Sequence, residues 1–381
     1  MQQDILKYDV IIVGAGPAGC ACALALAEAG LKVALLDKQT FPRDKVCGDA
    51  IPLRALKTLR KISPAFEQAF KEFPRKLETK RTSVYYKNRS ASFDWVHEAY
   101  VCARYDFDNF LLDLVKQHTD AEMIIPVVPV SFQLNSDSVT VKLLDRPSLE
   151  AKLIIGADGV NSTVAKQLAG KTLDRTHHAG SVRAYFSNLA DLDNGMNIYF
   201  DTRYIPSYLW VFPLPGNTAN VGFGMLSSEI ARQKIDLKKA FYDFIDRNEE
   251  LKYKFRDGIQ KGGLRGAGLP LGENTNNISG PRFMLTGDAA SLVDPITGEG
   301  IGNAMVSGEL AAKQAITCFE NNDFSAASMK AYDLSVSAAI GKELYYRYKT
   351  QGAIAKLPWL LDILFMAAKN KTAKRWIQNA L

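Results

Sequence analysis

Short runs of consecutive apolar residues alternate with helical patterns in the first part of the chain. The run "YDVIIV" at residues 8–13 is typical of a strand buried on both faces of a parallel sheet. A glycine-rich turn and an Ala/Leu-rich stretch follow, which predict a helix up to Ala29 with Gly30 as its C-terminal cap. "KVALLD" then predicts a second strand that ends on Asp37. This order predicts a parallel α/β unit.

Later in the chain the pattern changes to short runs rich in β-branched and aromatic residues. "SVRAYFSN", "MNIYFD", "SYLWVFP" and "TANVGFGM" predict an antiparallel sheet in a separate lobe, and the helical residues 228–255 are expected to cover it. Residues 82–95 predict a hairpin of this lobe, whereas 127–144 predict a hairpin of the first unit. We therefore predict a first domain of residues 1–80, 97–176 and 278–335, a second domain of 81–96 and 177–277, and a helical C-terminal segment of 336–381.

Composition narrows the class of protein. With 381 residues, 47% of them apolar, the chain is globular and long enough for about two domains. A formal charge of +6 without a concentrated basic surface argues against nucleic-acid binding. The five scattered cysteines and four histidines lack metal-ligand spacing, so we expect no metal, surface histidines and a reduced, cytoplasmic protein. No run reaches the roughly 18 apolar residues that a membrane span requires.

The turn after the first strand has the spacing G-x-G-x-x-G. Gly14 permits the tight turn, Gly16 lets the backbone approach a pyrophosphate, and Gly19 permits close packing of helix and strand. Asp37 lies where a carboxylate can bind a ribose hydroxyl. The sequence therefore predicts dinucleotide binding. The predicted contacts are Gly14, Gly16, Pro17, Ala18, Gly19, Asp37 and Lys38.

Two distant segments distinguish FAD from NAD. "LIIGADGVNSTVAKQL" (153–168) and "RFMLTGDAASLVDPITGEGIGNAMVSGELAA" (282–312) each run from a strand into a glycine–aspartate pair. With the first turn they resemble the three fingerprints of the flavoprotein hydroxylase and geranylgeranyl reductase superfamily, the para-hydroxybenzoate hydroxylase-like proteins. The resemblance implies an α/β fold (α+β overall), in which a Rossmann-like FAD-binding domain with a parallel sheet joins a mostly antiparallel β-sheet substrate domain and a C-terminal helical segment.

The same resemblance implies further cofactor contacts. In the family, the aspartate that matches Asp288 binds the ribityl chain, and the segment from Pro295 to Gly302 lies along the flavin. A helix that starts near Gly300 would aim its positive end at the N1–O2 edge of the flavin. The R-x-x-F-D-x-x-L segment carries over Arg104. The contacts implied in these segments are Arg104, Asp158, Gly159, Asp288, Pro295, Gly298, Gly300, Ile301 and Gly302.

The stretch "FPRDKVCGDA" fits the loop P-x-x-K-x-C-G of the geranylgeranyl reductase branch. That resemblance places Lys45, Cys47 and Gly48 beside the isoalloxazine ring, with Lys45 and Cys47 as catalytic candidates. A lysine there offsets negative charge during reduction, and Gly48 permits close backbone approach. Cys47 is a proton donor, a redox partner or only a packing residue, because its role depends on its pKa.

Alternation in residues 208–213 sends Tyr208, Trp210 and Phe212 to one face of a strand, and Gly222 follows in the next. On the residues alone, an ordinary sheet core is the simpler interpretation. The segment resembles the family signature Y-x-W-x-F-P…G-x-G, which implies that these four residues line the substrate cavity and that Tyr208 and Trp210 are catalytic candidates. An aromatic wall suits an isoprenoid or fatty chain, whose burial contributes about 0.8 kcal/mol per methylene.

The resemblance favours an FAD-dependent oxidoreductase that reduces C=C bonds of an isoprenoid or other lipid-like substrate. The alternative is a monooxygenase or halogenase-like enzyme that uses dioxygen and NAD(P)H, although hydroxylases usually have an arginine where this chain has Ala165. A quinone-linked dehydrogenase and a non-enzymatic lipid carrier are weaker alternatives. NAD(P)H and ferredoxin both remain open as electron donors, and the oligomeric state is not predicted.

The C-terminal "KLPWLLDILFMAAKNKTAKRW" combines an apolar helix with a basic flank. It predicts a helical lid over the substrate cavity, or peripheral contact with a membrane surface.

Overall fold

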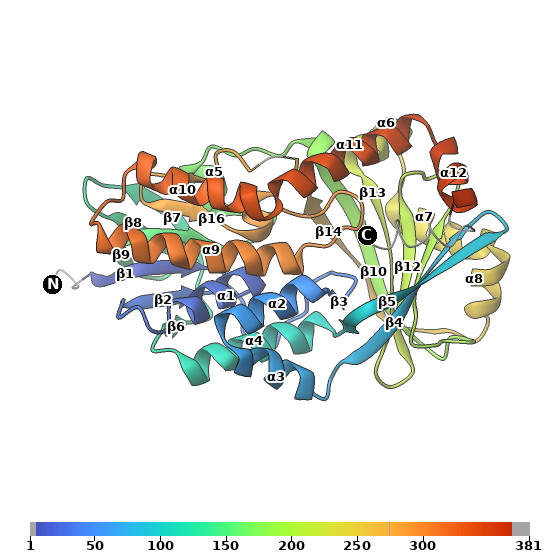
Figure 1. The fold of residues 1–381 in the computed structure, drawn as a ribbon, viewed down its shortest axis with the longest axis horizontal. Helices are drawn as coiled ribbons and strands as arrows, with labels where there is room; N and C mark the ends of the chain where they lie inside the picture. Colours follow the sequence, from blue (N-terminus) through green and yellow to red (C-terminus); the bar gives the residue numbers. More distant parts are fainter. Residues whose placement is uncertain (1–4, 274, 368–381) are drawn as a thin grey trace.

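Two β-sheets form the two halves of the molecule, and helices cover them (Figure 1). The protein is described here from a computed structural model, in which residues 5–273 and 275–367 are described. Figure 1 shows the first sheet in the half that holds the N-terminus and the second sheet in the other half. The mixed α/β architecture confirms the predicted fold class.

The first sheet, sheet A, is built around the predicted parallel strands. β1 pairs in parallel with β2 on one side and β9 on the other, so that Val10–Val13 lie between Val33–Leu36 and Leu153–Gly156. The expected hairpin of β7 and β8 is present, and β8 pairs with β9. The described strands of sheet A are β1 (Leu6–Val13), β2 (Val33–Leu36), β6 (Glu122–Ile124), β7 (Pro129–Leu134), β8 (Val139–Leu143), β9 (Arg146–Gly156), β15 (Ser279–Gly280) and β16 (Phe283–Leu285).

The helices of this half include the predicted helix after the glycine-rich turn, but that helix is shorter than expected. It ends at Ala25 instead of Ala29, because the next amides form three-residue turns such as Ala27 N to the Leu24 carbonyl. Gly30, with φ of 64°, therefore ends a turn and does not cap the helix. The helices here are α1 (Pro17–Ala25), α2 (Leu53–Ile62), α3 (Pro64–Glu72), α4 (Arg104–His118), α5 (Thr163–Leu168), η2 (Gly287–Ala290), α9 (Ile301–Glu320) and α10 (Ala326–Val336).

The second sheet, sheet B, contains the predicted β-rich runs. Neighbouring strands of sheet B are antiparallel, apart from the parallel pair β4 and β11. The predicted hairpin at 82–95 forms the tip of the longer hairpin of β4 and β5. These two strands extend beyond the 81–96 boundary, and the division into domains stays a prediction. The described strands are β3 (Ala50–Ile51), β4 (Leu77–Tyr86), β5 (Arg89–Val101), β10 (His178–Ser187), β11 (Met196–Phe200), β12 (Tyr208–Leu214), β13 (Thr218–Leu226) and β14 (Ile259–Pro270).

One face of sheet B is covered by helices, as expected for residues 228–255. Leu209, Val211 and Phe223 pack with Phe241 and Phe244 in a buried apolar cluster. Side chains alternate along a strand, so Tyr208, Trp210 and Phe212 lie on the opposite face. The small helices of this half are η1 (Arg175–His177), α6 (Ser227–Gln233), α7 (Leu237–Arg247) and α8 (Glu249–Lys254).

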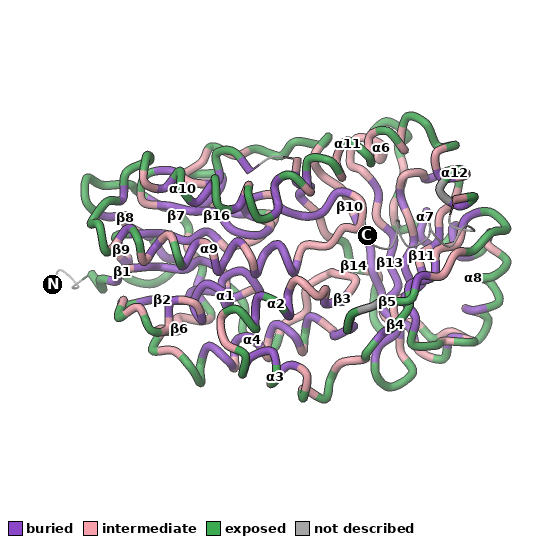
Figure 2. Tube along the Cα trace, viewed as in Figure 1, coloured by how far each residue is buried: buried purple, intermediate pink, exposed green. Residues whose placement is uncertain are grey.

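Burial follows the two sheets. Figure 2 shows buried backbone along the strands and along α1 and α9, with exposed residues in the outer loops and helix faces. The larger apolar cluster surrounds sheet A, where Val10, Ile11 and Ile12 are fully buried. Each half thus has its own apolar cluster, and the larger cluster also includes Ile51 of β3 and Tyr100 of β5.

The last described helices cross from one half to the other. After α10, η3 (Ser337–Gly341) and α11 (Lys342–Lys356) lead toward sheet B, where α12 (Trp359–Ala367) lies near β4 and β5 (Figure 1). Leu361 and Phe365 of α12 pack with Tyr86 of β4. Within the described ranges, none of the helices is long and apolar enough to cross a bilayer.

Candidate active site

The glycine-rich turn at the end of β1 is closely packed from both sides. A Cβ on Gly14, whose φ is 110°, would lie 2.3 Å from the Ala157 carbonyl oxygen, and one on Gly19 would lie 1.8 Å from the Gly14 oxygen. Asp37 Oδ2 accepts a hydrogen bond from Ala15 N at 2.9 Å and so holds the turn against the end of β2. No side chain caps the start of α1 at Gly16. Its first N–H groups therefore face outward, as anion binding at a helix N-terminus requires.

The second predicted segment meets this turn through its backbone. Asp158 N would lie 3.0 Å from a Cβ on Gly14. The Asp158 carboxylate instead accepts hydrogen bonds from Ser162 Oγ at 2.5 Å and Thr163 N at 2.7 Å, at the start of α5. Asp158 thus shapes the backbone beside Gly14, and its expected contact with the cofactor stays a prediction.

The third segment runs from η2 to the start of α9. Buried Asp294 accepts hydrogen bonds from Ile296 N and Thr297 N and pairs with Arg347 at 2.7 Å, which fixes the turn that contains Pro295. Gly298 has φ of 69°, a conformation that glycine adopts at little cost.

The N-terminus of α9 begins where the sequence predicts, with Ile301 as its first residue and Gly300 as its N-cap. Glu299 Oε1 accepts a hydrogen bond from Gly302 N at 2.5 Å. Burial raises the pKa of the Glu299 carboxyl to about 7. This carboxyl therefore titrates nearer to neutral pH than a free glutamate, within the segment expected to lie along the flavin.

Residues 43–49, which we call the hinge loop, connect these parts. Lys45 Nζ lies 3.0 Å from Asp288 Oδ2, so the loop and the third predicted segment of the site are in direct contact. Arg43 lies 3.1 Å from Asp108 and 3.6 Å from Asp37. The loop thus joins the ends of β2 and β16 and the start of α4.

Arg104 is bound to a carboxylate of its own helix. Its guanidinium forms two hydrogen bonds with the buried Asp108, at 2.6 and 2.7 Å. The same carboxylate also binds Arg43. In this geometry Arg104 supports the hinge loop through Asp108, and its expected contact with the cofactor stays a prediction.

Cys47 and Gly48 lie against the aromatic face of sheet B. A Cβ on Gly48 would lie 3.2 Å from the Phe212 ring and 3.5 Å from Trp210 Nε1. Asn220 Nδ2 donates to the Cys47 carbonyl oxygen at 2.7 Å. Burial raises the pKa of the Cys47 thiol, which is therefore neutral at physiological pH.

The aromatic residues of β12 share one face, as predicted. Ring centroids lie 6.3 Å apart for Tyr208 and Trp210, and 6.4 Å apart for Trp210 and Phe212. The indole covers Gly222, where a Cβ would lie 2.1 Å from a ring carbon. The Tyr208 hydroxyl donates to the Thr297 carbonyl, so this face meets the third segment as well as the hinge loop.

Four polar residues at the centre of the site were missed by sequence reasoning. Asp49, Arg183, Tyr185 and Asn220 are buried or half-buried around the hinge loop. Arg183 Nη2 donates to Asp44 at 2.6 Å and to the Lys45 carbonyl at 3.2 Å. A usable signal was present, because Arg183, Tyr185 and Asn220 are polar residues on predicted strands, at positions that face the same side as Trp210.

Some predicted residues do not join this group. The Lys38 side chain is exposed beyond the end of β2. His97 and His118 are exposed as expected, but His177 and His178 are half-buried. His177 binds Asp174 and Glu273, and His178 binds Ser227, so the surface interpretation is wrong for these two.

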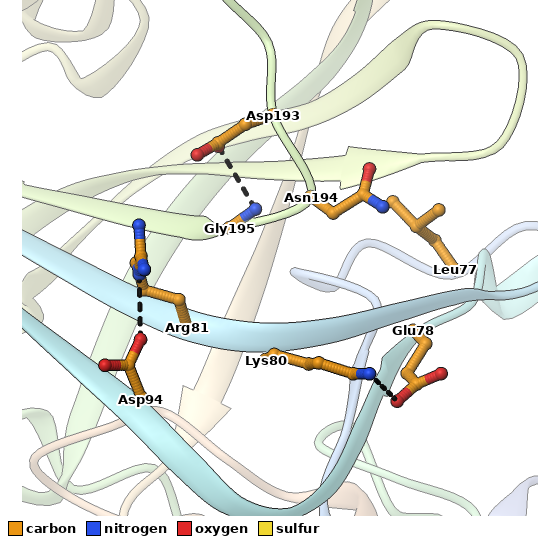
Figure 3. Close-up of a pocket in the computed structure, with 8 residues that line it drawn as sticks. All are labelled: Leu77, Glu78, Lys80, Arg81, Asp94, Asp193, Asn194 and Gly195. Carbon is orange, nitrogen blue, oxygen red and sulfur yellow. Dashed lines mark hydrogen bonds and ion pairs between the residues drawn. The ribbon is translucent and has the colours of Figure 1, made fainter.

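The hollow drawn in Figure 3 is also separate from the site. It measures about 460 Å³ and opens between the β4–β5 strands and the loop before β11. Charged side chains line it, including Lys80 paired with Glu78 and Arg81 paired with Asp94. It contains none of the predicted site residues, and its polar lining does not suit a lipid chain.

The residues present fit FAD. The glycine-rich turn leaves an uncapped helix N-terminus for the pyrophosphate, and Asp37 stands at the end of β2, where a ribose would lie. Within the described residues, Arg183 Nε is a buried donor without a hydrogen-bond partner, close to the hinge loop. An orphaned donor of this kind is consistent with a ligand group at the site.

Comparison with known proteins identifies the family. Residues 7–204 match the model of an FAD binding domain. The chain is 30% identical to a menaquinone reductase of Mycobacterium tuberculosis, over 80% of this chain and 76% of that protein. It is 31% identical to a digeranylgeranylglycerophospholipid reductase of Methanoculleus marisnigri, over 91% of this chain and 86% of that protein. The chain belongs to the geranylgeranyl reductase family of FAD-dependent oxidoreductases.

Solved structures agree with this assignment. A geranylgeranyl bacteriochlorophyll reductase-like protein from Thermoplasma acidophilum superposes with a TM-score of 0.83 at 25% identity, covering 97% of this chain and 93% of that one. A halogenase in complex with FAD superposes with a TM-score of 0.73 at 18% identity, covering 98% and 85%. The second likeness shows only a shared fold. The cofactor of this family member is FAD.

Proposed function

We propose that this protein is an FAD-dependent reductase that saturates C=C bonds in the isoprenoid chain of a lipid or a quinone. One observation carries the proposal. The hinge loop contacts the third cofactor segment through Lys45 and Asp288, and the aromatic face through Gly48, Trp210 and Phe212. A flavin beside this loop would therefore lie next to an apolar, aromatic surface. The relatives named as menaquinone reductase and digeranylgeranylglycerophospholipid reductase support an isoprenoid substrate.

FAD bound at this site would, in its reduced form, supply the hydride for one carbon of the double bond. The chain supplies the proton for the other carbon, and we propose the half-buried Cys47 thiol as its source. Burial keeps this thiol protonated at neutral pH, and solvent returns its proton after turnover. The Tyr208 hydroxyl is less suited, because its proton is engaged with the Thr297 carbonyl. Lys45 offsets negative charge near the cofactor.

The proposed function is tested by anaerobic titration of the reduced holoenzyme with menaquinone and with a geranylgeranyl-chain phospholipid. We expect the oxidised flavin spectrum to return with one of them and the product to have gained two hydrogens in its prenyl chain, with the quinone ring not reduced. Cys47→Ala should slow this reoxidation at least about a hundredfold, as for loss of a general acid. The matched control is Cys318→Ala, since Cys318 is buried in α9 and not part of the hinge loop.

The monooxygenase alternative predicts a different result in the same experiment. Reduced enzyme that stays reduced with every prenyl lipid, but consumes dioxygen faster when a substrate is added, would establish the monooxygenase alternative. Re-reduction of the oxidised enzyme with NADH, NADPH or reduced ferredoxin, tried in parallel, identifies the electron donor.

We further propose that the enzyme works at the cytoplasmic surface of a membrane, with α12 in contact with anionic lipid. Trp359, Ile363 and Met366 share one exposed face of α12. The opposite face packs on Tyr86, which pairs with Phe200, and Phe200 contacts Tyr208. The contact would therefore lie at the outer end of the aromatic face. Residues 363–381 contain four Lys or Arg and no acid, and this basic flank falls largely outside the described residues.

A further inference from the structure

Asn220 of β13 links the hinge loop to the aromatic face through a single amide group. Its Oδ1 accepts a hydrogen bond from Trp210 Nε1 at 2.9 Å. Its Nδ2 donates to the Cys47 carbonyl at 2.7 Å and to Asp49 Oδ2 at 2.6 Å. An indole N–H only donates and a carbonyl only accepts, so these two partners fix the orientation of the amide. The side chain is fully buried, and neither hydrogen of Nδ2 is free for another partner.

Asp49 completes this arrangement from the loop side. It is fully buried, with φ of 66°, a left-handed conformation that aspartate tolerates better than most residues. Its Oδ2 also accepts a hydrogen bond from the Tyr185 hydroxyl at 2.9 Å, and its Oδ1 accepts one from Arg104 N at 3.2 Å. All three neighbours donate, so the carboxylate acts only as an acceptor. Burial raises its pKa to about 6, and it remains mostly ionised at neutral pH.

The position of this pair distinguishes it from an ordinary buried polar contact. Phe212 and Tyr185 are the cross-strand neighbours of Asn220, so the amide stands in the middle of the face that meets the hinge loop. Two of its three partners belong to residues 47–49, and the third is the Trp210 ring that contacts Gly48. The pair therefore sets how far Cys47 and Gly48 lie from the aromatic face.

We propose that Asp49 and Asn220 are positioning residues for the reduction, acting as a clamp that holds Cys47 and Gly48 against Trp210. The proposal rests on the proposed function, because it assigns the clamp to the alignment of the Cys47 thiol and the flavin-side backbone with the substrate face. Both residues act by positioning the loop, and neither contacts the reacting atoms in this proposal. Loss of the clamp lets the Cys47 peptide move, with the side chains of the site left in place.

The exchange variant Asp49→Asn/Asn220→Asp separates positioning from packing. Asp49→Asn alone turns an NH₂ group toward one of the three donors that face position 49, and Asn220→Asp alone opposes two carboxylates, so each single variant conflicts with a neighbour. In the exchange variant the new amide at position 49 donates to the new carboxylate at position 220, which still accepts from Trp210. The donor to the Cys47 carbonyl is lost, and the Tyr185 hydroxyl loses its acceptor Oδ2 but can accept from the second hydrogen of the new amide. The matched control is Asn197→Ala, which removes a buried amide of β11 that binds the Gly195 carbonyl instead of the hinge loop.

The first measurement is the rate at which iodoacetamide alkylates Cys47, followed by mass spectrometry. The other four cysteines are buried, so Cys47 is expected to react first. The exchange variant should react about tenfold faster than wild type, while its unfolding midpoint stays near that of Asn197→Ala. This readout needs no substrate, so it stands even if the proposed reduction fails.

The second measurement is the flavin itself. In the exchange holoenzyme the visible flavin spectrum should shift, and single-turnover reoxidation by the prenyl substrate should slow about tenfold. Trp210→Phe, which removes the donor that orients the amide together with part of the ring that covers Gly222, should also raise Cys47 alkylation, and it serves if the exchange variant does not fold. Wild-type alkylation and flavin spectrum in both variants would overturn the proposal and reduce the pair to a packing contact.

Discussion

At the scale of single residues, Gly308 decides how closely α1 and α9 approach. A Cβ at this position would lie 2.1 Å from the Ala18 carbonyl oxygen, a backbone atom that cannot move aside without shifting the glycine-rich turn. Gly352 in α11 provides a contrast, because a Cβ there meets no atom within 4 Å. The same substitution should therefore have opposite effects at the two positions.

We expect Gly308→Ala to lower the free energy of unfolding by about 1–2 kcal/mol, since overpacking outweighs the gain in helix propensity. It should also weaken FAD binding, because the turn that follows β1 moves with α1. Gly352→Ala should raise the free energy of unfolding by about 0.5–1 kcal/mol and leave FAD binding unchanged. Urea unfolding and fluorescence titration with FAD measure both effects. Equal effects of the two substitutions would contradict this account of the helix contact.

Sequence reasoning found the residues whose role depends on local spacing and missed those that depend on distant contacts. Gly14, Gly16 and Gly19 lie in one turn, so their spacing alone indicates a phosphate-binding backbone. Asp49 and Asn220 are 171 positions apart and meet only after both sheets have formed. Nothing in the local sequence of either residue specifies the other. The same limit applies to the partner of Arg104, because the sequence alone did not indicate its ion pair with Asp108.

At the scale of elements, α12 is the helix whose two faces have different partners. Leu361 and Phe365 are buried against Tyr86, and Asp362 binds Lys87 and Arg89 at the tip of the β4–β5 hairpin. The helix is therefore held on sheet B from one side. Its other face presents apolar side chains to the surroundings, which is the pattern of helices that lie in a membrane interface.

We expect Trp359→Ser/Ile363→Ser to reduce binding to phosphatidylglycerol-containing vesicles at least about tenfold, since both side chains would lose burial in the acyl boundary. The control, Leu173→Ser/Ile259→Ser, removes two apolar side chains elsewhere that are at least as exposed, and it should bind like wild type. Vesicle sedimentation measures the bound fraction. Wild-type binding by the α12 variant would refute the lipid contact. A change in sedimentation coefficient without vesicles would instead identify a second copy of the chain on this face.

Element boundaries show which part of the fold local patterns specify. The strands β1, β2 and β9 were predicted because each contains a short, continuous run of apolar residues, which is typical of buried parallel strands. The predicted end of α1 lies four residues too late, because Leu26 to Ala29 are residues that favour a helix. In the structure these residues form turns that lead to β2. The tertiary structure overrides the helix propensity of these residues, and nothing in the sequence indicates that the helix ends at Ala25.

At the scale of the whole molecule, the hinge loop is one of the connections that couple the two halves. The loop contacts the half that holds sheet A through Arg43 and Lys45. It contacts sheet B through Asp44, Cys47 and Asp49. Asp49 accepts hydrogen bonds from Tyr185 and Asn220. A ligand that binds beside this loop therefore stabilises both halves, although the glycine-rich turn belongs to sheet A alone. The consequence is measurable without any substrate.

We expect FAD to slow hydrogen exchange in β12 and β13 as well as in the turn after β1. Ligand at a hundred times its dissociation constant adds about 2.7 kcal/mol to every opening that destroys the site, and detachment of the hinge loop is such an opening. The strand β7 is the internal control, because among the described strands it pairs only with β8, away from the loop. Its exchange should change little. If FAD protects β12 and β13 no more than β7, the two halves are not coupled through residues 43–49, and the aromatic face is not held by the cofactor loop.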